Sequence, residues 1–170
     1  GVLGIAGDSA GGNIAAGATL ALRSMGAPLP AFQLLGYPVL SSAMDSASYR
    51  DQRDGPVLTA ADMAWFWDRY APDQATRTDP RAAPLEAGDL TGLPPTMIFT
   101  AQCDPLRDEG EAYANRLHDA GTIVSYRCYK GMVHGFYKTF SALESSCAAF
   151  ANIREFVGRQ LLKQPFSAER

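Results

Sequence analysis

The stretch GIAGDSAGGNIAAG, residues 4–17, decides how this chain folds. Its centre, GDSAG at residues 7–11, fits the pattern G-x-S-x-G, in which a serine sits on a sharp turn between a strand and a helix. Apolar residues precede this turn and an alanine-rich run follows it. These flanks predict a buried strand over residues 2–6 and a helix over residues 11–25, with Ser9 at the turn between them.

Strand and helix patterns alternate along the rest of the chain. Short apolar runs predict strands over residues 31–37, 96–101 and 123–129. Longer capped or amphipathic runs predict helices over residues 59–70, 104–120 and 139–162, while residues 41–55, 72–95 and 130–135 are expected to be irregular or loops. Such alternation is typical of βαβ units. We therefore expect an α/β fold with a mainly parallel sheet of about four strands and flanking helices.

Composition and charge exclude several classes of protein. The 170 residues suit one domain, and a charged fraction of 19% with a net charge of -3 argues against nucleic acid or an anionic membrane surface as a partner. No apolar run reaches the roughly 18 residues of a membrane span, and the apolar first residues, without a basic leader or a cleavage site, predict no signal peptide. Three cysteines without a C-x-x-C spacing indicate reduced thiols, so a cytoplasmic location is expected. With only two histidines, no metal site is expected.

Three residues with catalytic chemistry follow three of the predicted strands. Ser9 follows the first strand, Asp104 the third and His134 the fourth. Because functional groups gather beyond the carboxyl ends of parallel strands, we expect these side chains to lie together. Their order along the chain is that of α/β-hydrolase triads. The arrangement favours Ser9 as nucleophile, His134 as base and Asp104 as the acid that orients the histidine.

Each of these residues also has a simpler interpretation. The pattern around Ser9 occurs by chance in glycine-rich turns, and a lone loop histidine such as His134 is most often a solvated surface residue. Asp104, which precedes a proline, is a good N-cap for the following helix, although a cap can still face a histidine. Asp108 and Glu109, in the first turn of that helix, are the alternative acids.

Two further predictions concern the oxyanion and the substrate pocket. The backbone amide of Ala10, at the start of the predicted helix, is expected to donate a hydrogen bond to an oxyanion. The aromatic run at residues 65–67, with Tyr70, fits either an acyl pocket or ordinary core packing, which is the commoner role. Phe136, close to His134, is the better candidate for lining a pocket.

These motifs carry a family resemblance. GDSAGGN at residues 7–13, DPLRDEG at residues 104–110 and HGF at residues 134–136 resemble motifs of the bacterial hormone-sensitive-lipase family of carboxylesterases. GLPP at residues 92–95 and the Tyr37-Pro38 pair are similar too. The resemblance implies an α/β-hydrolase fold, the same three catalytic residues and no cofactor.

One departure from the family is serious. Family members carry a His-Gly-Gly-Gly motif upstream of the nucleophile, which completes the oxyanion hole, and amino-terminal helices that cap the site. Neither stands in this sequence. We therefore expect residues 1–170 to form a single α/β-hydrolase domain that lacks its amino-terminal half.

The leading hypothesis is a serine carboxylesterase that hydrolyses short-chain acyl esters through an acyl-enzyme intermediate. The alternatives are a non-catalytic binding module on the same scaffold, and an inert fragment of an esterase. Small-molecule esters are the expected partners, and a homodimer is possible.

Overall fold

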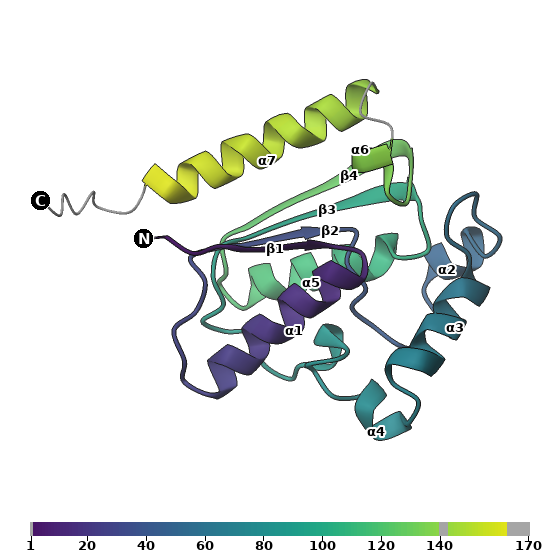
Figure 1. Ribbon diagram of the computed structural model, residues 1–170, viewed down its shortest axis with the longest axis horizontal. Coiled ribbons are helices and arrows are strands. Elements are labelled where there is room, and N and C mark those ends of the chain that lie inside the picture. Colours follow the sequence, from purple (N-terminus) through teal and green to yellow (C-terminus); the bar gives the residue numbers. More distant parts are fainter. Residues whose placement is uncertain (1, 140–142, 163–170) are drawn as a thin grey trace, which may run out of the picture.

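The computed structural model describes residues 2–139 and 143–162, and it is built around one parallel sheet (Figure 1). The strands are β1 (Ile5–Asp8), β2 (Gln33–Gly36), β3 (Thr96–Cys103) and β4 (Val124–Val133). They pair in the spatial order β1-β2-β3-β4, and every pair is parallel. The expected α/β fold with about four parallel strands and flanking helices is confirmed.

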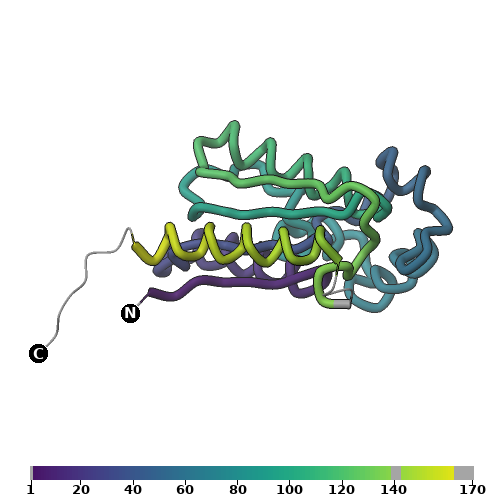
Figure 2. Tube along the Cα trace, turned by 90° about the horizontal axis from the view of Figure 1, so that it is seen from above, coloured from purple at the N-terminus to yellow at the C-terminus, as the bar shows by residue number. Residues whose placement is uncertain are grey.

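Helices cover both faces of the sheet. The helices α1 (Ala10–Ser24) and α5 (Arg107–Asp119) pack on one face, and α7 (Glu144–Leu162) runs lengthwise along the strands on the other (Figures 1 and 2). Each face of the sheet has its own hydrophobic core, and alternate residues of β3 pack into one or the other. Ile98 packs toward α1 and α5, and Phe99 packs toward α7. Residues 96–101 are all buried, as expected of a strand that is covered on both sides.

Shorter helical segments lie in the connections between these elements. They are α2 (Ala47–Asp51), α3 (Ala60–Tyr70), α4 (Gln74–Arg77), the 3-10 turn η1 (Pro84–Glu86) and α6 (Phe136–Thr139). The start of α3 is fixed by a capping box, in which the Thr59 side chain accepts from the amide of Asp62 and the Asp62 carboxylate accepts from the amide of Thr59. Thr59 is thus the cap that the sequence predicts.

Several predicted boundaries are wrong. The first strand pairs over Ile5–Asp8 rather than residues 2–6, because its register with β2 begins at Ile5. The segments 41–55 and 72–95 contain the short helices α2, α4 and η1. The last strand continues to Val133, four residues beyond its predicted end. The last helix begins at Glu144, and residues 140–142 of its predicted range lie outside the described residues.

No helix within the described ranges is long and apolar enough to cross a membrane.

Candidate active site

Ser9 sits on a strained turn between β1 and α1. Its φ of 54° and ψ of -122° lie in a region that residues other than glycine rarely adopt. Backbone hydrogen bonds hold it there: the Ser9 amide donates to the Gly36 carbonyl at 2.8 Å, and the Ser9 carbonyl accepts from the amide of Asn13 at 3.1 Å. This backbone conformation directs the Ser9 side chain away from α1, at the edge of the sheet where the strands have their carboxyl ends.

Gly7 and Gly12 make this turn possible by allowing close contact. A Cβ atom on Gly7 would stand 2.1 Å from the Gly11 carbonyl oxygen, and one on Gly12 would stand 2.8 Å from Cβ of Pro38. Neither distance is possible between real atoms. Strand, helix and the loop after β2 therefore approach more closely here than any side chain at these two positions would permit.

Asp104 follows the end of β3 and is fully buried. Its Oδ1 accepts a hydrogen bond from the amide of Leu106 at 2.9 Å, while its Oδ2 lies 2.7 Å from Nδ1 of His134. The carboxylate thus closes the turn before α5 and faces the histidine at the same time. The helix itself begins at Arg107, three residues after Asp104.

His134 lies in the turn between β4 and α6, where Gly135 has a φ of 76°. Its Nε2 is 2.9 Å from Oγ of Ser9, and its side chain is 13% exposed. One imidazole therefore contacts both Ser9 and Asp104, although the three residues come from three different strand ends. With the Nδ1 proton donated to Asp104, Nε2 is free to accept the proton of the serine hydroxyl.

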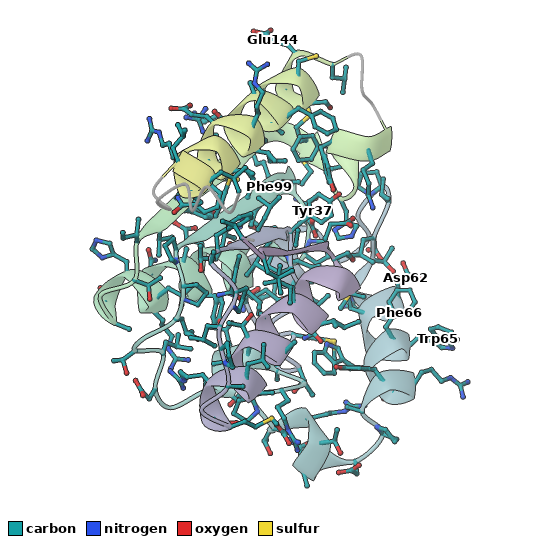
Figure 3. The ribbon with its side chains drawn as sticks, turned by 60° about the vertical axis from the view of Figure 1, so that its left-hand side comes forward. Tyr37, Asp62, Trp65, Phe66, Phe99 and Glu144 are labelled. Carbon is teal, nitrogen blue, oxygen red and sulfur yellow. The ribbon has the colours of Figure 1, made fainter. Side chains whose placement is uncertain are left out.

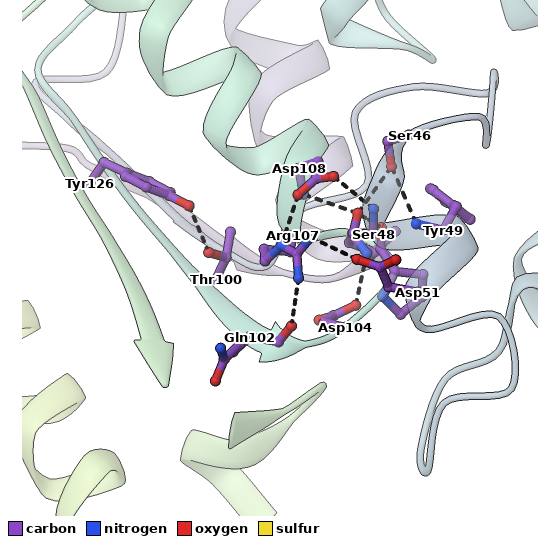
Figure 4. Close-up of polar contacts among 12 residues, drawn as sticks. Ser46, Ser48, Tyr49, Asp51, Thr100, Gln102, Asp104, Arg107, Asp108 and Tyr126 are labelled. Atoms are coloured by element: carbon purple, nitrogen blue, oxygen red, sulfur yellow. Dashed lines mark hydrogen bonds and ion pairs between the residues drawn. The ribbon is translucent and has the colours of Figure 1, made fainter. Parts of the chain in front are cut away.

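The alternative acids face elsewhere. Asp108 pairs with Arg107 at 2.8 Å and accepts from the amide of Ser48 at 2.7 Å (Figure 4). Glu109 is buried beneath the loop after β2, where it accepts from the amide of Leu40 at 3.0 Å. Burial raises the pKa of Glu109 well above its usual range. Neither carboxylate contacts His134, and both fasten neighbouring loops around Asp104.

The turn that carries Asp104 is further held by α2. The Ser48 hydroxyl donates to the Pro105 carbonyl at 2.6 Å, and Arg107 donates to the Gln102 carbonyl at 3.2 Å (Figure 4). These bonds span both sides of Asp104 in the sequence. The position of the carboxylate is therefore fixed by its surroundings as well as by its own two hydrogen bonds.

An apolar cavity of about 130 Å³ opens beside Ala10, the first residue of α1. Its walls come from α1, the loop after β2, and α3, and they include Ala10, Val39, Met63, Phe66, Trp67 and Tyr70. Of the aromatic run, Trp67 is buried, whereas Trp65 and Phe66 lie at the outer edge of the molecule (Figure 3). Phe66 and Trp67 therefore line the cavity, Trp67 as part of the core, whereas Trp65 belongs to neither.

Phe136 is not part of the wall of the cavity beside Ala10. It is fully buried and packs in an aromatic cluster with Phe99, Tyr129 and Tyr37. The expectation based on its closeness to His134 is corrected, because its side chain points into the core. The sequence predicted no role in the site for Tyr37, whose ring lies 4.5 Å from the imidazole of His134, centroid to centroid.

No group of three or more His, Cys, Asp or Glu side chains that could hold a metal ion occurs among the residues that the structure describes.

The chain is similar to known hydrolases over most of its length. Residues 2–138 match the model of the alpha/beta hydrolase fold family. The carboxylic ester hydrolase LipN of Mycobacterium tuberculosis is 40% identical over 149 residues, which cover 85% of this chain and 40% of that protein. The ethyl acetate hydrolase of Pseudomonas putida is 33% identical over 162 residues, 94% of this chain and 50% of that protein.

A solved structure of another ester hydrolase is also similar to this chain. An ester hydrolase from the metagenome of Lake Arreo, complexed with a bipyridine phosphonate derivative, has a TM-score of 0.86 and 44% identity. The match covers 92% of this chain and 50% of that one. The chain thus spans about half or less of the length of these relatives. It belongs to the alpha/beta hydrolase fold family and is a homologue of the carboxylesterases of the hormone-sensitive-lipase type.

Proposed function

We propose that this chain carries the catalytic triad of a serine carboxylesterase that acts on short-chain acyl esters. The observation that carries the proposal is the imidazole of His134, which lies 2.9 Å from Oγ of Ser9 and 2.7 Å from Oδ2 of Asp104. A nucleophile, a base within hydrogen-bond reach and a third group that orients the base are the requirements of this chemistry.

The proposed reaction has two halves. His134 Nε2 takes the hydroxyl proton as Ser9 Oγ attacks the ester carbonyl, and the resulting imidazolium returns that proton to the leaving alcohol oxygen as the C–O bond breaks. Water then attacks the acyl-enzyme with the same base, releasing the acid and restoring Ser9. Asp104 holds the Nδ1–H tautomer and stabilises the imidazolium through its buried carboxylate.

We assign the amide of Ala10 as one donor to the oxyanion of the tetrahedral intermediate. It is the first residue of α1, and the amides at a helix amino terminus have no partner within the helix. The helix dipole adds a partial positive charge there. A single such donor is typically responsible for about 10²–10³ in rate.

The apolar cavity beside Ala10 supports a short acyl or alkyl group as the part of the ester that binds there. Its apolar walls suit an uncharged group, and its volume of about 130 Å³ has room for a short chain. The name of one relative, ethyl acetate hydrolase, agrees with a short-chain ester. The proposed chemistry needs no metal or cofactor, because proton transfer and nucleophilic attack are supplied by side chains.

The two alternatives make different predictions from this proposal. A binding module does not need a base that contacts the serine, so the contact between His134 and Ser9 favours a catalytic site over that alternative. An inert fragment of an esterase would keep the same contact, and it is separated from an active enzyme by measuring hydrolysis with the chain itself. The expected cytoplasmic location and a homodimer belong to the same proposal. Sedimentation of the purified chain, and fractionation of cells that produce it, would test these two points.

Substitution of Ser9 tests the proposed function. We expect Ser9→Ala to lower the hydrolysis of p-nitrophenyl acetate by about 10³-fold or more and to abolish labelling by a fluorophosphonate that reacts with activated serines. Ser24→Ala, at the exposed end of α1, is the matched control and should react like the parent. Labelling that persists in Ser9→Ala would show that Ser9 is not the nucleophile.

A further inference from the structure

The segment that carries His134 has a second connection to the turn around Ser9. His134 lies between β4 and α6, and Lys138 lies one turn later, within α6. Within residues 2–139 and 143–162, two polar side-chain contacts join this segment to the nucleophile turn. One is His134 with Ser9, and the other is Lys138 with Asp8. The proposed reaction uses the first contact and leaves the second unexplained.

Asp8 and Lys138 form a close ion pair. Nζ of Lys138 lies 2.9 Å from Oδ1 and 2.7 Å from Oδ2 of Asp8. Asp8 is the last residue of β1 and directly precedes Ser9, so the pair ties α6 to the neighbour of the nucleophile. The G-x-S-x-G pattern leaves this position open to any residue. The turn itself therefore does not require an aspartate.

Tyr37 links this ion pair to the imidazole. Its ring lies against that of His134, and its hydroxyl donates a long hydrogen bond of 3.4 Å to Oδ2 of Asp8. Burial, together with the nearby Asp8 carboxylate, raises the pKa of Tyr37, so the hydroxyl stays protonated and able to donate. The φ of Tyr37 is 30°, which lies in the left-handed region. Its buried surroundings, rather than its own backbone preference, hold the ring beside His134.

We propose that Asp8 and Lys138, with Tyr37 between them and the imidazole, are positioning residues that hold His134 at hydrogen-bond distance from Ser9. This inference rests on the proposed function, because it assigns roles within the same site. A pair whose lysine side chain is 56% exposed contributes little to folding. A misplacement of a catalytic group by about 1 Å, in contrast, can cost about 10²-fold in rate. Loss of the pair should therefore lower reactivity more than stability.

The test measures the rate at which the fluorophosphonate labels Ser9 in the 170-residue chain. We expect Lys138→Met to slow labelling by about fivefold, the upper range for a pair with an exposed partner, and Lys138→Arg to restore most of the rate. High salt should slow the parent toward the rate of Lys138→Met, because it screens the pair. The matched control is Arg159→Met, which removes an ion pair with Glu155 on α7, far from the site and more exposed, and should label at the parent rate.

A double variant shows whether the two residues act together. We expect Asp8→Asn combined with Lys138→Met to label no more slowly than the slower single variant, because either change already breaks the same contact. Two losses that multiply, or a Lys138→Met variant that labels at the parent rate, would overturn the proposal. Thermal unfolding of each variant verifies that the comparison is made between folded proteins.

A spectroscopic readout separates this inference from the proposed function. The chain has two histidines, and the side chain of His118 is 79% exposed, so it serves as an internal reference. In the magnetic resonance spectrum of isotope-labelled protein, Lys138→Met should shift or broaden the ring signals of His134 and leave those of His118 unchanged. A parent chain that is not labelled at Ser9 contradicts the proposed function alone. Unchanged His134 signals in Lys138→Met would contradict the positioning role whatever the reactivity.

Discussion

At the scale of single residues, the nucleophile turn depends on a glycine, which has no Cβ atom, as much as on Ser9 itself. Ser9 adopts strained dihedral angles that cost about 1–3 kcal/mol when the surroundings must impose them. Gly7 precedes Ser9 by two residues, and the backbone of Gly11 fills the space that a Cβ on Gly7 would need. Gly11, in contrast, has nothing within 4 Å of the place where its Cβ would stand.

This difference predicts that substitution by alanine changes the free energy of unfolding differently at Gly7 and at Gly11. Gly7→Ala should lower the free energy of unfolding by about 1–3 kcal/mol or more, because the new methyl group would collide with a carbonyl oxygen at 2.1 Å. Gly11→Ala, within α1, should leave stability unchanged or raise it by up to about 1 kcal/mol. Urea unfolding of both variants measures the two effects. Equal losses at both positions would contradict this account of the turn.

The residues of the candidate site could be predicted from the sequence where a motif fixes a backbone position. Ser9, Asp104 and His134 each follow a strand, and parallel strands bring their ends to one edge, so their meeting in space could be foreseen. The direction of a side chain could not. Phe136 is two residues from His134 but points into the core, and Tyr37 lies against the imidazole with only a Tyr-Pro pair to indicate it.

At the scale of elements, α5 fastens the loop after β2 through a buried carboxyl group. Glu109 is 5% exposed, and its Oε1 accepts from the amide of Leu40. Burial raises its pKa well above the usual range, and the charge of Asp104 acts in the same direction. A group whose pKa is raised by folding stabilises the protein below its unfolded pKa, and that stability is lost as the pH rises.

Glu109→Gln tests this link between α5 and the loop. Glutamine keeps an acceptor for the Leu40 amide but cannot ionise. The unfolded chain releases the Glu109 proton near pH 4.3, the ordinary value for a glutamate, while the folded chain retains it to higher pH. We therefore expect the parent to lose stability relative to Glu109→Gln as the pH rises from about 4 toward neutrality. Urea midpoints at a series of pH values measure the difference, and parallel curves would contradict it.

Element prediction succeeded where a pattern is long enough to be recognised. The helix capped by Thr59 and the apolar run of β3 are examples. The helices α2 and α4 have five and four residues, too few for a helical period to show, although side-chain caps from Ser46 and Asp73 fix their starts. The extra length of β4 depends on an irregularity in the register of β3 and β4. Ala101 pairs with Tyr129 and Cys103 with Val133, so β4 has two more residues than β3 between these two pairs. Such a bulge is a property of two strands together.

At the scale of the whole molecule, the two outer strands of the sheet are protected unequally. Within the described residues, β1 and β4 each have one neighbour. The outer strand β4 carries the exposed charges of Arg127 and Lys130, which discourage pairing with another chain. β1 has no positive charge, and Leu3, just before it, is 76% exposed. We expect self-association of the chain to begin at the β1 edge.

A charge placed beside β1 should therefore reduce association more than the same charge placed elsewhere. Leu3→Lys keeps the backbone bond from the Ala31 amide to the residue 3 carbonyl, and at an exposed site it should change stability by no more than about 0.5 kcal/mol. The matched control is Leu162→Lys, at a residue that is 85% exposed at the end of α7. Both substitutions move the net charge from -3 to -2, so a general effect of charge would treat them alike. Sedimentation velocity should show fewer large species for Leu3→Lys and a distribution like the parent's for Leu162→Lys. Equal behaviour of the two variants would show that association does not begin at β1.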